Sequence, residues 1–180
     1  YLAMEYVPGY DLMTISLEHE RHGEYMPPEL AARVIADAAQ ALHYAHDAVS
    51  ARGQPLHIIH RDVTPHNILL SRTGEVKVID FGVAKATMAG RPETEPGLVK
   101  GKFRYVSPEQ AMAQPLDARS DLFTVGVMLY QLLTGELPYA GQQHTVMQAI
   151  VQGEYVRPRR RAGDIPEPLA DVVQKAMETR

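Results

Sequence analysis

The alternation of apolar and polar positions predicts a chain built mostly from helices. Pro27 and Pro28 should open a long helix, because proline fits the first helical turn and apolar residues then follow at intervals of three and four. The apolar stripe comprises Leu30, Val34, Ala38, Ala41, Leu42 and Ala45. Upstream, Asp11 is expected to cap a short helix that ends before Gly23.

The second half of the chain contains three further helical patterns. Ser120 or Asp121 can cap an apolar helix that runs to Leu133 and stops at the glycine two positions later. Two shorter amphipathic helices are expected over 145–153 and 169–177. Helix is therefore the main predicted structure in this half as well.

One β-hairpin is predicted among these helices. Residues 68–70 and 76–79 are short apolar segments, and the Thr-Gly pair at 73–74 favours a turn between them. Residues 2–4 are expected to end another strand. Residues 87–102 have no apolar period and predict a long loop, which in a compact domain is usually functional or disordered. The predicted fold class is mainly α with a small β-hairpin.

Composition places the chain among ordinary globular proteins. Its 180 residues are 45% hydrophobic and 22% charged, which argues against intrinsic disorder. With 18 basic and 22 acidic side chains the net charge is −4, so no nucleic-acid partner is expected. The absence of cysteine excludes disulfides and thiolate chemistry. No apolar run is long enough to span a bilayer, so no membrane segment is expected.

Chemistry concentrates in two polar motifs on either side of the predicted hairpin. The triplet His-Arg-Asp at 60–62 is followed by Asn67, and Asp-Phe-Gly at 80–82 comes directly after the second strand. Because the two strands are antiparallel, the hairpin should return Asp80 to the side of Asn67. A carboxylate and an amide oxygen in one place suit Mg²⁺, which prefers hard oxygen ligands. The sequence therefore predicts a magnesium site here.

Together with Ser-Pro-Glu at 107–109, these motifs resemble the H-R-D-x-x-x-x-N, D-F-G and A-P-E set of protein kinases. The amino-acid sequences of 61–67 and 107–110 are similar to those in the Hanks-type Ser/Thr kinases of myxobacteria and their relatives. The resemblance covers the whole chain but only the large C-terminal lobe and the hinge of that fold, so the N-terminal lobe is absent. It implies a partial kinase domain over 1–180, with four named parts: the hinge at 1–11, the catalytic loop at 60–67, the activation segment at 80–109 and the central helix at 121–133.

The resemblance implies that the parent protein transfers the γ-phosphate of ATP to Ser/Thr hydroxyls of a protein substrate, with Mg²⁺ as cofactor. Such a reaction depends on positioning and on charge stabilisation. Asp62 is the expected catalytic base, and Asn67 and Asp80 are the expected metal ligands. Asp121 resembles the acid that ties down the catalytic-loop backbone. The ATP-binding residues implied in the same way are Met4, Glu5, Val7, Asp11, Leu69 and Asp80.

Two positions beside the expected base depart from the family pattern. Ser/Thr kinases usually have Lys two residues after the catalytic Asp, where this chain has Thr64. They usually have Thr after the glycine that ends the activation segment, where this chain has Lys102. The two family side chains meet, so we expect Thr64 and Lys102 to have exchanged roles, with the ammonium offsetting phosphate charge. The alternative is that Lys102 is a solvated loop lysine.

The resemblance also implies a regulatory site. Arg61 and Lys85 occupy positions that pair with a phosphorylated residue of the activation segment in the family, and arginine binds phosphate well. Thr87 and Thr94 are the hydroxyls available for phosphorylation. A plain loop threonine is the alternative for each.

The sequence has no Gly-rich loop, no β3 lysine and no partnering helix glutamate. We expect these parts to precede Tyr1, in an N-terminal lobe that is a further partner, and the isolated chain to be inactive. The other expected partners are ATP and a protein substrate, and the expected location is cytoplasmic. Two alternatives remain: a small-molecule phosphotransferase of the aminoglycoside-kinase type, against which segment 83–109 weighs, and a pseudokinase or interaction module without catalysis.

Overall fold

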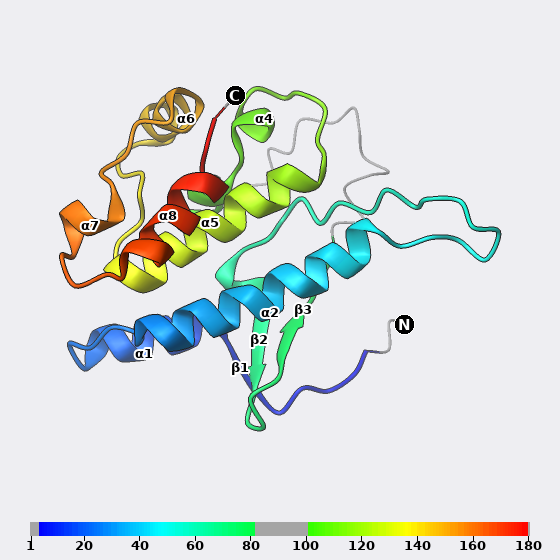
Figure 1. Cartoon of the computed structure of the whole chain (residues 1–180), viewed down its shortest axis with the longest axis horizontal. Coiled ribbons are helices and arrows are strands. Elements are labelled where there is room, and N and C mark those ends of the chain that lie inside the picture. Colours follow the sequence, from blue (N-terminus) through cyan, green and yellow to red (C-terminus); the bar gives the residue numbers. More distant parts are fainter. Residues whose placement is uncertain (1–3, 82–100, 180) are drawn as a thin grey trace.

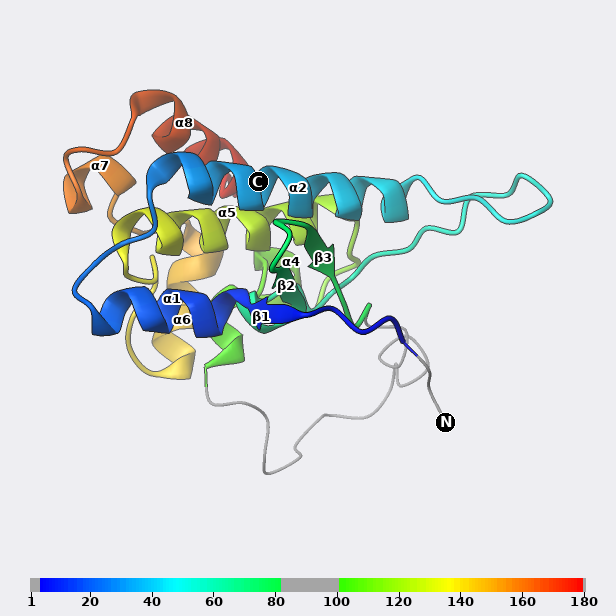
Figure 2. The ribbon, with the colours of Figure 1, turned by 90° about the horizontal axis from the view of Figure 1, so that it is seen from below.

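The computed structural model describes residues 4–81 and 101–179 of the chain. Within them helices dominate and three short strands form an antiparallel sheet, so the predicted fold class is confirmed. In chain order, with η marking a 3₁₀-helix, the elements are β1 (Gly9–Asp11), α1 (Leu12–Arg21), α2 (Pro28–His46), η1 (Pro65–Asn67), β2 (Ile68–Ser71), β3 (Val76–Val78), η2 (Lys102–Tyr105), α4 (Pro108–Ala111), α5 (Ala118–Thr134), α6 (Gln143–Gln152), α7 (Pro158–Arg161) and α8 (Glu167–Ala176). The long helix α5 packs against α2 and against α8 (Figures 1 and 2).

The small sheet has the strand order β1–β2–β3. β2 and β3 form the predicted hairpin, and β1 adds a strand that the sequence does not predict. A Cβ at Gly9 of β1 would lie 1.9 Å from the carbonyl oxygen of Leu70, so this close pairing requires glycine. Of the strand expected at 2–4 only Met4 is described, and it belongs to no strand.

The first two helices begin where the sequence predicts. Asp11 caps α1, because its Oδ1 accepts a hydrogen bond from the Thr14 amide at 2.9 Å. The buried stripe of α2 differs from the predicted one at its start, since Leu30 is 43% exposed while Ala31 and Ile35 are buried. The reason is helical geometry: position 31 lies about 100° further round the helix than position 30, and that face meets α5.

The start of α5 corrects the predicted cap. The cap is Asp117, which has an extended backbone and accepts a hydrogen bond from the Arg119 amide at 2.9 Å. Ser120 and Asp121 lie inside the first turn and are buried. The helix stops, as predicted, at Gly135 in the left-handed conformation. The central helix expected at 121–133 therefore lies within a slightly longer α5.

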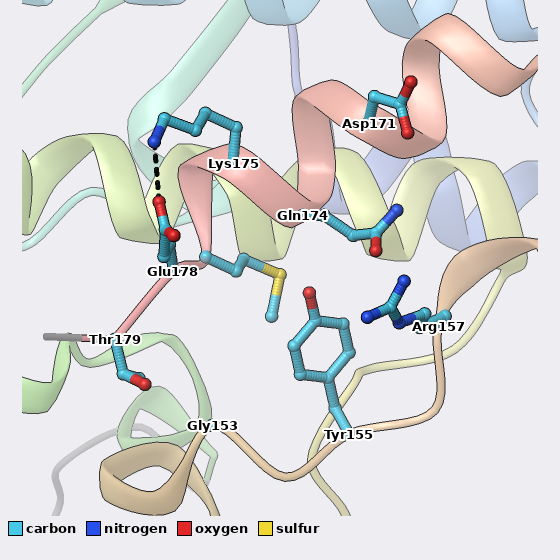
Figure 3. A pocket seen from close by; sticks show the side chains of 9 residues that line it. Gly153, Tyr155, Arg157, Asp171, Gln174, Lys175, Glu178 and Thr179 are labelled. Carbon is cyan, nitrogen blue, oxygen red and sulfur yellow. Dashed lines mark hydrogen bonds and ion pairs between the residues drawn. The ribbon is translucent and has the colours of Figure 1, made fainter.

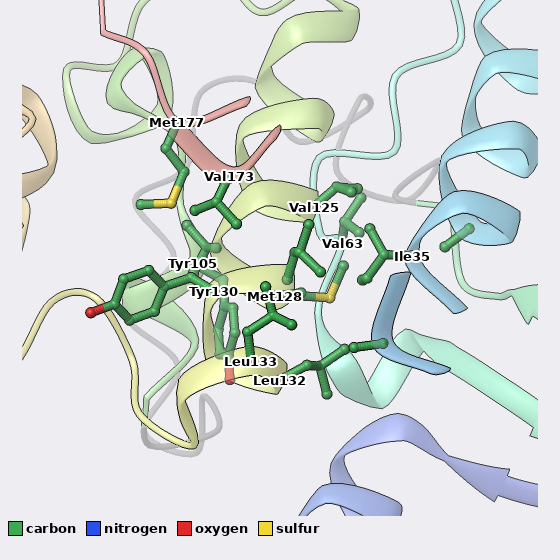
Figure 4. Close-up of a cluster of buried hydrophobic side chains, with 14 of the residues drawn as sticks. Ile35, Val63, Tyr105, Val125, Met128, Tyr130, Leu132, Leu133, Val173 and Met177 are labelled. Atoms are coloured by element: carbon green, nitrogen blue, oxygen red, sulfur yellow. The ribbon is translucent and has the colours of Figure 1, made fainter. Parts of the chain in front are cut away.

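Helix α5 is the centre of the hydrophobic core. Side chains are buried around most of its circumference, which is typical of a helix inside a protein. Figure 4 shows Val125 and Met128 of α5 gathered with Ile35 of α2 and Val173 of α8 in one cluster. None of the helices in the described ranges has the length and apolarity needed to cross a membrane.

Candidate active site

Asp121, at the start of α5, holds the segment 60–67 through its buried carboxylate. Its Oδ1 accepts a hydrogen bond from the Arg61 amide at 2.9 Å, and its Oδ2 accepts one from the His60 amide at 2.9 Å. His46, at the end of α2, donates a third bond from Nε2 to Oδ2 at 2.8 Å. Asp121 is only 1% exposed, so these partners replace water around its charge. One carboxylate thus fixes the backbone beside Asp62, as the resemblance implies.

The role of His46 is not predicted by the sequence. Its position on α2 suggests only a helix surface, and its partner lies 75 positions away in the sequence. No local spacing could have revealed a contact of this kind.

His60 connects the same segment to the end of the hairpin. Its ring is fully buried, and Nε2 donates a hydrogen bond to the carbonyl oxygen of Ile79 at 2.9 Å. The ring also packs against Phe81, with 4.6 Å between the centroids. Because Asp80 lies between Ile79 and Phe81, His60 helps to set the position of the Asp80 backbone.

Asn67 and Asp80 provide the two oxygen donors predicted for a metal. Asn67 Nδ2 donates to the carbonyl oxygen of Asp62 at 2.8 Å, which leaves its Oδ1 as the acceptor available to a cation. The Asn67 carbonyl accepts a bond from the Ile79 amide at 3.0 Å, so the residue before Asp80 is tied to Asn67. Among the described residues no cluster of three or more His, Cys, Asp or Glu side chains occurs. One carboxylate and one amide oxygen fit Mg²⁺, which keeps water and phosphate as its other ligands.

Two residues of the site have a left-handed backbone. Arg61 has φ 68° and Asp80 has φ 57°, a region that residues other than glycine seldom adopt. Arg61 is held there from both sides, since its amide bonds Asp121 and its carbonyl accepts a bond from Gln110 Nε2 at 2.7 Å. Strained backbone of this kind is frequent at functional sites.

Lys102 lies beside the expected base. Its Nζ donates to Asp62 Oδ2 at 2.8 Å, and the two side chains are 26% and 19% exposed. Thr64 is buried, and it lines the same two small cavities as Lys102. The structure therefore brings together Asp62, Thr64 and Lys102, the three residues of the predicted exchange.

Two of the predicted ATP-binding residues, Asp11 and Leu69, lie on β1 and β2. Asp11 faces Leu69 across the two strands. Both carboxylate oxygens of Asp11 contact Thr14, at 2.9 Å to its amide and 2.8 Å to its hydroxyl, so the helix cap already employs this side chain. Glu5 is exposed and its carboxylate accepts from Lys77 Nζ of β3 at 3.1 Å.

For the other predicted residues of the hinge, Met4 and Val7, the described residues show no specific contact. Met4 is 66% exposed and Val7 is half-buried. The regulatory residues Lys85, Thr87 and Thr94 lie outside the described residues, and only Arg61 of that set is described.

Two larger cavities lie away from these residues. One of about 510 Å³ opens between α8 and the segment after α6, where Arg157, Gln174 and Lys175 line it (Figure 3). Another of about 980 Å³ runs along α2, α5 and α8 and has mostly apolar walls, including Ile35 and Val172. No predicted site residue within the described ranges lines either of them, so the candidate chemistry stays at the smaller cavities beside Asp62.

Comparison with known proteins agrees with this assignment of the motifs. A family model described as the protein kinase domain matches residues 1–179. The chain is 42% identical over 178 residues to "Tyrosine-protein kinase MasK" of Myxococcus xanthus, covering 98% of this chain and 27% of that protein. It is 42% identical over 180 residues to "Serine/threonine-protein kinase PknB" of Mycobacterium tuberculosis, with coverage of 98% and 27%. "Probable serine/threonine-protein kinase CPE1738" of Clostridium perfringens is 38% identical over 179 residues, with coverage of 99% and 24%. The chain spans about a quarter of the length of these relatives.

Proposed function

The chain belongs to the protein kinase domain family, and on this premise we propose that the protein transfers the γ-phosphoryl group of ATP to Ser or Thr hydroxyls of a protein substrate. The observation that carries the proposal lies at one end of the hairpin, where Asn67 bonds the Asp62 backbone and the residue before Asp80, and the Lys102 ammonium bonds the Asp62 carboxylate. A pseudokinase would have no need to keep both the expected base and the two metal ligands.

The reaction needs few covalent participants. Asp62 accepts a hydrogen bond from the substrate hydroxyl and takes its proton as the oxygen bonds to the γ-phosphorus, while the bond from that phosphorus to the ADP oxygen breaks. Lys102 offsets the negative charge on the transferred group. Asn67 Oδ1 and the Asp80 carboxylate would hold Mg²⁺, which would supply positive charge to neutralise the phosphates. The hydrogen bond that Asp121 accepts from the Arg61 amide and the one that Asn67 donates to the Asp62 carbonyl keep Asp62 in place during the step.

The nucleotide lies, in this proposal, against β1 and β2. Leu69 forms the floor under the adenine, the backbones of Glu5 and Val7 bond its edge, and Met4 lies behind it. Asp11 reaches the ribose only if its bonds to Thr14 are shared. An N-terminal lobe covers the phosphates, and the domain works in the cytoplasm, where ATP is available.

The residue type of the acceptor is a separate question. PknB and CPE1738 are named as serine/threonine kinases, whereas MasK is named as a tyrosine kinase. We favour Ser and Thr, because the catalytic loop lacks the Ala-Ala-Arg or Arg-Ala-Ala form seen in tyrosine kinases. Matched peptides that differ only in carrying Ser, Thr or Tyr as acceptor decide between the two.

The direct test is the substitution Asp62→Asn in the full-length protein. It should lower kcat by about 10²–10⁴, the usual contribution of a general base, while ATP affinity stays nearly constant. Asp164→Asn, at an exposed aspartate outside the site, is the matched control. A loss of less than about tenfold for Asp62→Asn would show that this carboxylate is not the base.

A further inference from the structure

A small cavity of about 190 Å³ opens next to the pair formed by Asp62 and Lys102. Its walls come from α1, from the segment 60–67, from η2 and from α5. Thr64 and Lys102 line both this cavity and the smaller one that contains Asp62. A residue next to the acceptor of a bound substrate could therefore enter it while the acceptor hydroxyl lies at Asp62.

Among the described residues, the charged side chains that line this cavity are cations. Lys102 and Arg104 line it together with His66, and no aspartate or glutamate of the described residues does. The nearest carboxylates are already engaged. Asp62 accepts a bond from Lys102, and Asp11, whose oxygens cap α1, lies 3.6 Å from His66 Nδ1.

Two polar atoms of the wall are buried and have no hydrogen-bond partner among residues 4–81 and 101–179. They are the hydroxyl oxygen of Thr64 and Nε of Arg104. Thr64 is only 3% exposed, so water does not readily satisfy its hydroxyl. Buried polar groups are nearly always paired in folded proteins, and a pair of orphans at one cavity needs an explanation. The guanidinium Nε–H can only donate, and the hydroxyl can donate as well, so both groups are suited to an acceptor.

A third group of the cavity wall also offers hydrogen-bond donors. Tyr105 Oη donates to Gln131 Oε1 at 2.7 Å, which leaves the Gln131 amide hydrogens as donors. Burial raises the pKa of Tyr105 to about 12, so its phenol stays neutral and keeps donating at physiological pH. A cationic substrate side chain would meet hydrogen-bond donors and positive charge here, with which it cannot pair. An anionic side chain would accept hydrogen bonds from the same donors and pair with the positive charge.

We propose that this cavity binds an anionic side chain of the protein substrate, either a carboxylate or a phosphorylated residue, at a position that flanks the acceptor hydroxyl. The proposal rests on the proposed function and adds to it a preference for acidic sequence around the phosphorylated residue. Arg104 and Thr64 are the specificity-determining residues, because both line the cavity and each has an unpaired donor.

The test uses the full-length protein and a set of peptides with one Ser acceptor. At each flanking position in turn the peptide carries Glu, phosphoserine, Ala or Lys, and kcat/KM is measured. At one position Glu or phosphoserine should raise kcat/KM over Lys by about tenfold or more, the scale of one charge-assisted hydrogen bond. A phosphoserine preference over Glu identifies a previously phosphorylated neighbour as the source of the anion, and the reverse identifies an acidic residue.

Two variants test whether the preference for acidic peptides arises from this cavity. Arg104→Gln should reduce the Glu-to-Lys ratio of kcat/KM severalfold. Arg52→Gln, which removes the same charge from the exposed loop that extends away from the body in Figure 1, should leave the ratio as it is. Equal kcat/KM for Glu and Lys peptides at every position, or a preference that survives Arg104→Gln, overturns the proposal.

Binding of peptides with Ala in place of the acceptor Ser separates this proposal from the proposed function. Fluorescence anisotropy that shows tighter binding of the acidic peptide, lost in Arg104→Gln, supports the anion site even if no phosphate is transferred. Phosphorylation without any charge preference upholds the kinase activity and overturns the anion site. Absence of both binding and phosphorylation overturns both.

Discussion

Lys102 follows Asp62 by 40 positions in the sequence, yet its Nζ lies 2.8 Å from the Asp62 carboxylate. This contact supports the predicted exchange with Thr64 over a solvated lysine, because a lysine that is 26% exposed and paired with the expected base is not simply solvated. Kinetic measurements on variants at both positions test whether the ammonium acts in the transition state.

Lys102→Thr should lower kcat/KM by about 10²-fold, since it removes one preorganised charge beside the transferred group. Thr64→Lys in the same protein should recover part of the loss, because it restores the ammonium from the other side. The two effects should then be non-additive, as is typical of residues that share a cavity. Steady-state kinetics of both single variants and the double variant measure this. Additive effects would leave Lys102 as an ordinary paired lysine.

Asp80→Ala should remove most of the Mg²⁺ dependence of nucleotide binding, because it deletes the only charged ligand of the proposed metal pair. Calorimetric titration of ATP with and without Mg²⁺ in the full-length protein measures the effect. The thermal unfolding midpoint should change little, since Asp80 is exposed. If Mg²⁺ strengthens nucleotide binding equally in both proteins, the metal lies elsewhere.

Among the secondary-structure elements, those with a strong local signal are the ones that the sequence predicts. The cap and length of α1, the proline start of α2 and the β2–β3 hairpin all follow from residues within a few positions of each other. β1 has three residues, too few for an alternating pattern, and forms because β2 lies beside it.

The start of α5 shows why other features could not be predicted. Ser120 and Asp121 have the chemistry of a cap, but the Asp121 carboxylate bonds backbone amides 60 and 61 positions away. Its role depends on the tertiary structure, and so does the ion pair of Lys102 with Asp62. For the candidate site, the motifs are enough to propose Asp62, Asn67 and Asp80, whereas the contacts of His46, Gln110 and Arg104 required the structure.

The packing of α5 on α8 gives a prediction for Gly126. A Cβ at this position would lie 2.7 Å from the Cβ of Ala176 and 2.9 Å from Cγ of Met177. Gly126→Ala should therefore destabilise the protein by about 1 kcal/mol, because overpacking costs about 1–3 kcal/mol and the helical preference of alanine offsets about 1.

Chemical denaturation of Gly126→Ala measures this free energy of unfolding. Gly163→Ala is the matched control, since nothing lies within 4 Å of the Cβ that it adds. Its free energy of unfolding should stay within about 0.5 kcal/mol of the starting protein. A Gly126→Ala protein as stable as this control would mean that α5 and α8 can move apart without cost.

In the molecule as a whole, we expect stability and activity to depend on the same buried carboxylate. Asp121 belongs to α5, bonds the segment that carries Asp62, and receives a bond from the end of α2 through His46. Gln110, next to α5, bonds the same segment from the side of α4. Three helices thus determine the geometry of one loop.

Asp121→Asn should reduce both properties. The asparagine has nearly the same size, but its NH₂ group cannot accept, so at least one of the amides of His60 and Arg61 loses its partner in a buried place. A buried unsatisfied group costs about 1–3 kcal/mol. Denaturant unfolding and kcat/KM, with Asp164→Asn as the control, should both show a loss. Unchanged unfolding with reduced activity would mean that the carboxylate positions the loop without stabilising the fold.

The hydrogen bonds that Asp121 accepts also have a consequence for hydrogen exchange. The amides of His60 and Arg61 lie outside any helix or strand, where backbone amides usually exchange quickly with solvent. Because both donate to a carboxylate anchored in the central helix, they can open only when α5 separates from this segment. They should therefore exchange as slowly as amides in the middle of α5. The amide of Asp62, whose acceptor is the nearby His60 ring at 3.3 Å, should exchange much faster.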